Sequence, residues 1–269
     1  MNPTVIYLVG MGRSGSTLTD ILLDAHSGIQ GLGGVRRLAH YARKKPCPCG
    51  APSFRNCEFW SRVEANLKAD GGRTLETVDV HARDTGRFAE ENTALFRAAA
   101  SAGGTRFVTD NSKSAGRLAR LLAVPDLDVI PVFVHRDPRG RAQSIRKRSG
   151  MRYMPTVAYT HRSLRAWWLL RDRPHIAVEY EALAADPEGQ LERLMARLGL
   201  EAEPEQLAWA EQVHHNIGAA DVLDKTEGST IWPDDAWQQA LPGYMQGIIN
   251  AIAWPGRVAN AARHRRWGI

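Results

Sequence analysis

The stretch VIYLVGMGRSGSTLTDILLDA, residues 5–25, decides the fold of this chain. Its first five residues are apolar and rich in β-branched side chains, as in a buried strand. Glycines then interrupt the run, and apolar residues return from Leu18 to Ala25 at the i, i+3, i+4, i+7 spacing of a helix. We therefore expect a strand, a tight turn and a helix whose N-terminus directs backbone N–H groups and its positive dipole at an anion.

The turn itself, GMGRSGST at residues 10–17, has the glycine pattern of a phosphate-binding loop without its lysine. The nucleoside-triphosphate loop G-x-x-x-x-G-K-S/T uses that lysine to reach the β and γ phosphates, and Ser16 stands in its place here. The loop is therefore predicted to hold phosphate without handling a triphosphate, with Arg13 adding a positive charge. The alternative is a turn in which the glycines only permit positive φ.

The length suits one large domain or one and a half, and we expect a single domain over residues 1–269. With 43% hydrophobic and 24% charged residues, the composition is that of an ordinary globular protein. No apolar stretch approaches the roughly 18 residues of a membrane span, and no basic start precedes the first apolar run, so we expect a cytoplasmic protein. The formal charge of +6 favours an anionic partner such as a nucleotide. No nucleic-acid partner is expected because no reader motif accompanies the charge, and homo-oligomerisation stays open.

Strand and helix patterns alternate beyond the first turn. Residues 106–110, 129–134 and 176–178 are short apolar runs typical of buried parallel strands. This alternation predicts an α/β fold, a three-layer P-loop-like domain with a central parallel sheet flanked by helices. Residues 28–72, which carry the cysteines, are predicted to form an excursion over the carboxyl edge of the sheet, where ligands bind. Residues 200–269 are predicted to be a helical C-terminal part whose tryptophans pack in the core.

Three cysteines, Cys47, Cys49 and Cys57, lie close together in the sequence. Their odd number in a chain expected in the cytoplasm argues against a disulfide framework. Three thiolates and the imidazole of His40 would make a zinc site, but the C-x-C spacing is not the usual C-x₂₋₄-C. Plain buried thiols are therefore favoured, and no metal is predicted.

A second basic segment, VHRDPRGRAQS at residues 134–144, begins as a strand and continues as a helix. Asp137 is predicted to cap that helix, with a proline following it. Ser144 comes about two helical turns after the cap, on the same face as Arg141, while Arg136 marks the end of the strand. This combination predicts a second phosphate clamp. Two such clamps on adjacent strands suit a nucleotide phosphorylated at both ends of its ribose.

Together these segments resemble the sulfotransferases that use 3′-phosphoadenosine 5′-phosphosulfate (PAPS). Residues 12–18 look like their 5′-phosphosulfate loop, and residues 134–144 look like their 3′-phosphate segment. VTDNSKS, residues 108–114, resembles the strand end that carries an active-site lysine, and residues 178–187 resemble a third family block. Residues 47–60, with C-x-C-G and C-x-x-W, resemble bacterial members. The five motifs cover most of the chain in the family's order.

The resemblance implies a role for each matching residue. Lys113 would neutralise charge on the bridging oxygen or the sulfuryl group as the bond to sulfur breaks, in line with the electrostatic demands of group transfer. Arg136 and Ser144 would hold the 3′-phosphate, Tyr180 in the third block would contact the cofactor, and Arg13 would also act in catalysis. The residues implied in holding the 5′-phosphosulfate end are Gly12, Arg13, Ser14, Gly15, Ser16, Thr17 and Leu18.

One departure from the family pattern affects the chemistry. Many relatives carry a Gly-Glu pair just after the first helix and use the glutamate to take the acceptor's proton, but Gly34 stands at that place here. Three explanations stay open. His40 serves as the base; the acceptor is acidic enough, such as a phenol, to need little help; or the protein binds PAPS or its product without transferring sulfuryl groups.

The leading hypothesis is a sulfotransferase that moves a sulfuryl group from PAPS to a hydroxyl, or in second place an amine, of a small-molecule acceptor. A P-loop kinase of small molecules is an alternative supported by the strand, turn and helix alone, and the missing lysine disfavours it. A further alternative is a sulfotransferase-like protein that has lost the catalytic glutamate, and that binds nucleotides or polyanions or catalyses a different reaction.

Overall fold

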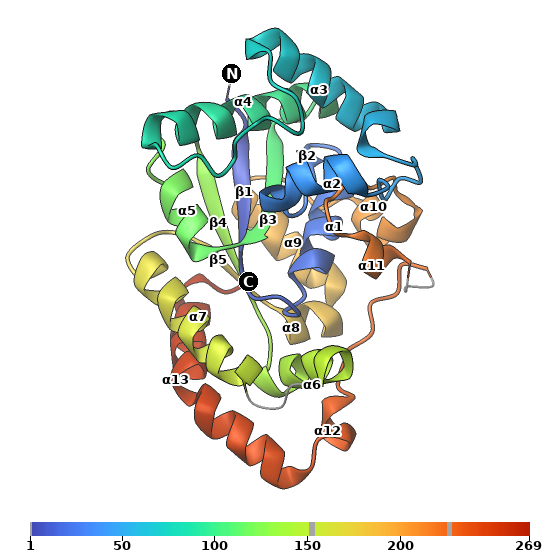
Figure 1. Ribbon diagram of the computed structural model, residues 1–269. Helices are drawn as coiled ribbons and strands as arrows, with labels where there is room; N and C mark the ends of the chain where they lie inside the picture. Colours follow the sequence, from blue (N-terminus) through green and yellow to red (C-terminus); the bar gives the residue numbers. More distant parts are fainter. Residues whose placement is uncertain (1, 151–153, 225–227) are drawn as a thin grey trace.

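The computed structural model describes residues 2–150, 154–224 and 228–269, in which strands and helices alternate along most of the chain (Figure 1). The strands are β1 (Thr4–Gly10), β2 (Ile29–Gln30), β3 (Phe107–Lys113), β4 (Val129–His135) and β5 (Ile176–Glu179). The longer helices are α1 (Ser16–Asp24), α2 (Leu38–Lys44), α3 (Glu58–Gly71), α4 (Thr85–Gly103), α5 (Ala115–Leu121), α6 (Pro138–Ser149), α7 (Met154–Leu170), α8 (Tyr180–Ala185), α9 (Pro187–Leu198) and α13 (Gly243–Trp267). The shorter helical segments are η1 (Val35–Arg37), η2 (Phe54–Asn56), α10 (Pro204–Leu207), η3 (Trp209–Glu211), α11 (Ala220–Leu223) and α12 (Trp237–Ala240).

All strands of the described sheet run parallel in the order β2-β3-β1-β4-β5. The central position of β1 places the loops after β1, β3 and β4 side by side at the carboxyl edge of the sheet. The strands expected near residues 106, 129 and 176 are confirmed, whereas the two-residue β2 was not predicted. In open parallel sheets this edge is where ligands bind, so the topology brings the two basic segments of the sequence together.

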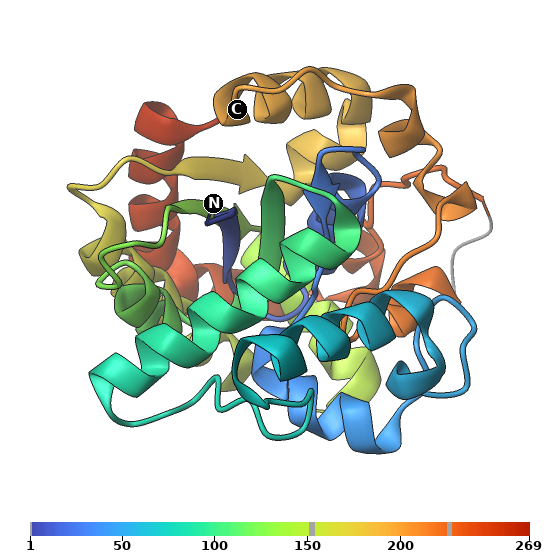
Figure 2. The ribbon, with the colours of Figure 1, turned by 90° about the horizontal axis from the view of Figure 1, so that it is seen from above.

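Alternate residues of β1 pack into different layers, as the two-residue period of a strand requires. Val5 and Tyr7 belong to the apolar cluster formed with α3, α4, α5 and α7, and Ile6 and Leu8 belong to the cluster formed with α1 and α9. Figure 2 shows α3 and α4 on one side of the sheet and α9 on the other. The predicted three-layer α/β fold is therefore confirmed.

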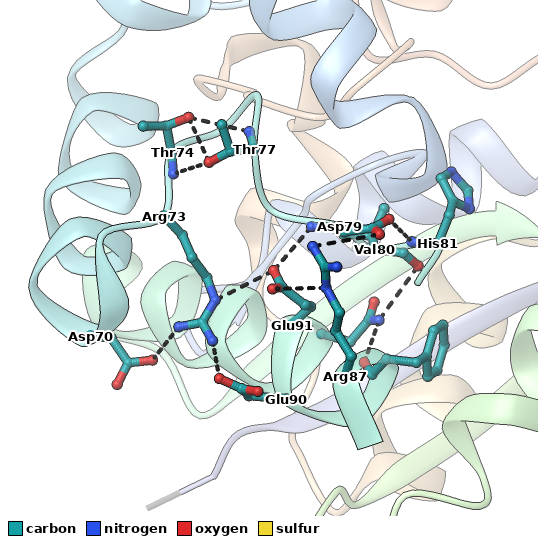
Figure 3. Close-up of polar contacts among 12 residues, drawn as sticks. Asp70, Arg73, Thr74, Thr77, Asp79, Val80, His81, Arg87, Glu90 and Glu91 are labelled. Atoms are coloured by element: carbon teal, nitrogen blue, oxygen red, sulfur yellow. Dashed lines mark hydrogen bonds and ion pairs between the residues drawn. The ribbon is translucent and has the colours of Figure 1, made fainter. Parts of the chain in front are cut away.

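The chain between β2 and β3 runs through η1, α2, η2, α3 and α4 before it returns to the sheet. The connection from α3 to α4 is held by ion pairs around Arg73, whose guanidinium contacts the carboxylates of Glu90 and Glu91 (Figure 3). Glu91 also accepts a hydrogen bond from the Asp79 backbone N–H at 3.0 Å. Farther along this connection, the ring of His81 contacts the Arg36 carbonyl oxygen at 2.9 Å. The connection therefore packs against η1, which directly precedes α2.

The C-terminal helix α13 packs along α7 at the lower left of Figure 1. Its buried face carries Met245, Ile249, Ala253 and Gly256, and a Cβ on Gly256 would lie 3.1 Å from the Thr160 Cα atom. The prediction that the C-terminal tryptophans pack in the core is wrong for Trp232, which is 77% exposed, and for Trp254, which lies on the opposite face of α13 and is 65% exposed. On the α13 side, small residues make the close contact with α7, whereas Trp254 lies outside it. None of the helices in the described part is long and apolar enough to cross a membrane.

Candidate functional site

The loop between β1 and α1 leaves the N-terminus of α1 open. Gly15 occupies the N-cap position with φ of 87°, and none of the described side chains caps the helix. A Cβ on Gly15 would lie 2.5 Å from the Tyr180 ring, so both the backbone conformation and the close approach require glycine. The hydroxyl oxygens of Ser14 and Ser16 are buried without a partner among the described atoms. The loop thus presents unpaired donors and a positive dipole end to a ligand.

Lys113 stands at the end of β3, directly beside this loop. Its ammonium group donates to the Thr17 hydroxyl oxygen at 3.3 Å, and its backbone adopts a left-handed conformation with φ of 63°. Burial lowers the pKa of Lys113, and the charges of Arg37 and Arg13 lower it further, while Asp20 acts in the opposite direction. A cation held this way, close to other cations and to a helix N-terminus, is suited to stabilise a developing negative charge.

Arg136 closes β4 on the other side of β1. Its side chain is buried, its guanidinium lies over the Tyr180 ring at 4.4 Å, and it forms an ion pair with Asp234 at 2.9 Å. Its Nε atom has no hydrogen-bond partner among the described atoms, although a Glu181 carboxylate oxygen lies 3.8 Å away as an ion pair. A buried guanidinium N–H without a hydrogen bond is costly, so this arginine can take an additional acceptor such as a phosphate oxygen.

Helix α6 follows β4 and connects the two basic segments. The Asp137 side chain accepts from the Arg139 N–H at 2.7 Å, which confirms the predicted cap, and a proline begins the helix. Arg141 on this helix donates from Nε to the Gly12 carbonyl oxygen at 3.0 Å. Arg141 therefore ties α6 to the β1–α1 loop and fixes their spacing, while Ser144 one turn later faces the ligand side.

One cleft of about 910 Å³ joins these parts at the carboxyl edge of the sheet. The predicted site residues that line it are Gly12, Arg13, Gly15, Ser16, Thr17, Leu18, Lys113, Arg136, Ser144 and Tyr180. Ser14 is fully buried behind the loop and contributes no lining surface. The two clamps expected from sequence therefore share a single cleft. Its volume is sufficient for a nucleotide and a second small molecule.

His40 does not line this cleft. It lies on the exposed side of α2, with its ring edge-on to Tyr41 at a centroid distance of 5.8 Å. The neighbouring Tyr41 faces the cleft instead, because successive residues on a helix are about 100° apart. The location of His40 therefore gives no support to its predicted role as a base.

Sequence reasoning missed several residues of the cleft. Arg37, Tyr41 and Lys45 line it from the region between β2 and α3, and Arg37 lies over the Tyr41 ring at 4.9 Å. The paired arginines after Gly34 were a usable signal for Arg37. Asp234 lines the cleft from a loop near the C-terminal helices, and nothing in its local sequence pointed there.

The lining is strongly positive. The cations among the described lining residues are Arg13, Arg37, Lys45, Lys113 and Arg136, and the one described acid is Asp234. A concave surface with this balance concentrates anions, because the low-dielectric walls focus the field. The arrangement can bind a small molecule with two separated anionic groups, one at the α1 N-terminus and one at Arg136.

The sequence and the fold are both similar to those of known proteins. The sequence matches the model of the sulfotransferase family over residues 3–204. The structure is similar to the sulfotransferase domain from the Curacin biosynthetic pathway, with a TM-score of 0.59 and 15% identity, covering 93% of this chain and 96% of that one. It is equally similar to the sulfotransferase domain of the Synechococcus PCC 7002 olefin synthase, with a TM-score of 0.59, 17% identity and 94% of each chain covered.

A third structure, a sulfotransferase from Mycobacterium tuberculosis, aligns with a TM-score of 0.50 and 14% identity over 94% of this chain and 77% of that one. No curated protein matches the sequence. At these identities the structural similarities establish the fold, and they agree with the P-loop-like architecture expected from sequence.

Proposed function

This chain belongs to the sulfotransferase family, and from that premise we propose that it transfers a sulfuryl group from PAPS to a hydroxyl, or in second place an amine, of a small-molecule acceptor. The observation that carries the proposal is the position of Arg13 and Arg136 on one cleft, at the ends of adjacent parallel strands. A donor with phosphates at both the 3′ and 5′ ends of its ribose needs two anion sites arranged in this way.

The 5′-phosphosulfate end is assigned to the β1–α1 loop. Backbone N–H groups of the first turn of α1, the Arg13 side chain and the Ser16 hydroxyl would bind its oxygens. The 3′-phosphate is assigned to Arg136 and Ser144, where the Arg136 Nε–H has no hydrogen-bond partner among the described atoms. The Asp234 carboxylate forms an ion pair with Arg136, so it would have to give way to the phosphate.

Lys113 is assigned to the reacting centre between the two clamps. PAPS would supply the sulfuryl group: the acceptor oxygen, its proton lost to solvent, would bond to sulfur in line as the bond from sulfur to the 5′-phosphate oxygen breaks, and adenosine 3′,5′-bisphosphate would leave. Lys113, Thr17 and the α1 N-terminus lie where they would neutralise the charge that develops on the phosphate. Ser16, in place of a P-loop lysine, suits this shorter anion better than a triphosphate.

The acceptor is inferred to ionise readily. Gly34 offers no carboxylate, and no histidine or glutamate is found among the described residues that line the cleft. The remaining acid, Asp234, is paired with Arg136. A phenolic hydroxyl fits best, because it loses its proton more easily than an alcohol and asks less of a base. The two neighbours whose names refer to biosynthetic enzymes are consistent with a small-molecule acceptor.

The missing carboxylate also favours a second candidate, a protein that binds PAPS or its product without turnover. Incubation with PAPS and a panel of phenols, alcohols and amines separates the two. The proposal expects release of adenosine 3′,5′-bisphosphate together with an acceptor whose mass has increased by one sulfuryl group. Tight bisphosphate binding with neither product would support the binding protein and contradict the transferase.

A further inference from the structure

A cluster of four metal-ligand side chains lies beside the cleft and is not used by the proposed reaction. Its members are Cys47, Cys49, Cys57 and His215, whose ligand atoms all lie within 4.8 Å of one another. Cys47 and Cys57 are buried, and the other two are half-buried. We call this group the thiol–imidazole cluster.

Three of the six distances within the thiol–imidazole cluster are close to those of a tetrahedral site, and all six are at most 4.8 Å. Bonds of about 2.3 Å to sulfur and about 2.1 Å to nitrogen place tetrahedral ligand atoms about 3.8 Å apart for two sulfurs and about 3.6 Å apart for sulfur and nitrogen. The Sγ atoms of Cys49 and Cys57 are 3.7 Å apart, and His215 Nδ1 lies 3.2 Å from Cys57 Sγ and 3.7 Å from Cys47 Sγ. We propose that the cluster binds one zinc ion through three thiolates and His215 Nδ1.

The local backbone brings the three thiols to one point. Lys45, Pro46 and Pro48 line the cleft, while the residues that alternate with the prolines, Cys47 and Cys49, belong to the cluster. The chain then turns back, with the Cys47 N–H bonded to the Ala51 carbonyl at 2.9 Å. This alternation is the reason that a C-x-C spacing serves here in place of the longer spacing common in zinc proteins.

The third thiol arrives from a different element. Cys57 occupies the N-cap position of the 14-residue helix α3, where the helix dipole favours a thiolate. Phe59 and Trp60 in the first turn of this helix pack beside the histidine ligand: the Phe59 ring stacks on the His215 ring at 4.9 Å, and the Trp60 Nε1–H donates to the His215 carbonyl at 3.1 Å.

His215 is held in place from the opposite side by its two neighbours. His214 Nδ1 contacts the Asp24 carboxylate at 2.6 Å, and Asn216 donates to the Asp20 carboxylate at 3.0 Å. Both carboxylates belong to α1. Residues 214 and 216 therefore contact α1, while residue 215 contacts the cysteines. Such support of a ligand by surrounding contacts is typical of metal sites.

The zinc would be structural, because four protein ligands leave no open position for a substrate. It would connect the turn at residues 46–50 and α3 to the segment after η3. That segment continues to Ile217, whose carbonyl accepts from the Gly34 N–H at 3.0 Å, and to Gly218 on the cleft. The metal would therefore fix one wall of the cleft. The fourth ligand of the proposed zinc site is His215. His40 was considered for this position from the sequence, but it lies on an exposed face and is not part of the cluster.

The first test uses the wild-type chain purified with a thiol reductant and without added metal. Elemental analysis should find about one zinc per chain, and titration of its three thiols with a mercurial reagent should release that zinc in proportion. Chelation should lower the melting temperature, because the ion binds only the folded state. A metal-free chain that takes up no Zn²⁺ or Co²⁺, or one with a Cys49–Cys57 disulfide after reducing purification, would overturn the proposal.

Variants identify the ligands. Cys57→Ser and His215→Ala should each lose zinc and the thiolate-to-metal absorption of the Co²⁺ form, whereas His40→Ala is the matched control and should keep both. Retention of full zinc in the Cys57→Ser and His215→Ala chains would contradict the assignment. If a ligand variant does not fold, the mercurial titration of the wild-type chain still decides the question.

Discussion

The ammonium group of Lys113 lies 3.3 Å from the hydroxyl oxygen of Thr17, across the gap between the end of β3 and the first turn of α1. Both residues line the cleft, and Arg13 and Arg37 lie close enough to lower the pKa of the lysine further, beyond the effect of its burial. At this contact, the positive side chains that follow β1 and β3 and the N-terminus of α1 lie close together. The proposed reaction depends on it.

Replacement of Lys113 by methionine should lower kcat for sulfuryl transfer by about 10²–10³-fold, because a positioned cation at the leaving oxygen is lost. The affinity for adenosine 3′,5′-bisphosphate should change much less, since other groups hold both phosphates. Methionine and lysine are equally strained by the left-handed backbone at position 113, so the variant differs from the wild type in the charge alone. Lys45→Met removes a charge from another wall of the cleft and is the control. An unchanged kcat in Lys113→Met would contradict the assigned role.

Asp234 is predicted to compete with the 3′-phosphate. Its carboxylate pairs with Arg136 at 2.9 Å, so Asp234→Asn should remove the competing negative charge, while the carbonyl of residue 234 still accepts from Arg136 Nη2 at 2.8 Å. Bisphosphate binding should tighten by about two- to fivefold, the range of a partly exposed ion pair. AMP, which lacks the 3′-phosphate, should gain nothing. Calorimetric titration of both ligands measures this, with Asp235→Asn as the exposed neighbouring control. Weaker bisphosphate binding in Asp234→Asn would show that the carboxylate assists binding.

Gly34→Glu should restore a general base. Gly34 has φ of −80°, which any residue tolerates, and an added Cβ would meet Arg37 and the Ile217 carbonyl only at ordinary contact distances of 3.6 and 3.7 Å. The variant should fold, and turnover of alcohol acceptors should rise by about tenfold or more. Gly34→Gln has the same shape without the basic group and should give no gain. Equal turnover of alcohol acceptors by the two variants would show that the missing glutamate does not limit the reaction.

His135 is predicted to make the fold sensitive to acid. Burial lowers its pKa to about 3, and the charges of His264 and Arg263 act in the same direction. The unfolded chain, with a histidine pKa of about 6.5, then binds the proton more readily. The stability contributed by neutral His135 is present above about pH 6.5 and is lost as the pH falls toward 3, by up to about 1.4 kcal/mol per pH unit.

Urea unfolding at a series of pH values checks this prediction. His135→Asn removes the titrating group, so its free energy of unfolding should fall less steeply between about pH 6.5 and 4.5 than that of the wild type. Other titrating groups, including the thiol–imidazole cluster, are common to both proteins and cancel in the comparison. Parallel curves for the two proteins would exclude His135 as a source of acid sensitivity.

The sequence carried enough information for β1, β3, β4 and β5 and for bringing the residues of both expected anion clamps to one cleft. The β1–α1 loop could be predicted directly, because its signals are local: a β-branched run, glycines at fixed positions and a helical repeat. The end of β4 was readable for the same reason, because Asp137 and the proline after it mark a helix start. Parallel strands then force the ends of β1 and β4 to one edge, so the shared cleft followed from the topology.

The remaining features depend on contacts between distant segments. Asp234 reaches Arg136 from 98 residues away, and His215 reaches Cys57 from 158 residues away, so no local spacing reports either contact. The face that α13 buries was misjudged for a related reason. Its contact with α7 is close enough to need Gly256, and a search for large apolar residues overlooks such a face.

Calorimetric titration with adenosine 3′,5′-bisphosphate and AMP tests the central claim most directly. The wild-type chain should bind the bisphosphate more tightly than AMP, Arg136→Ala should abolish that preference, and Arg13→Ala should weaken the binding of both ligands. A wild-type chain that does not distinguish the two nucleotides, or variants that bind both as well as the wild type, would contradict the assignment of the cleft to a doubly phosphorylated adenosine.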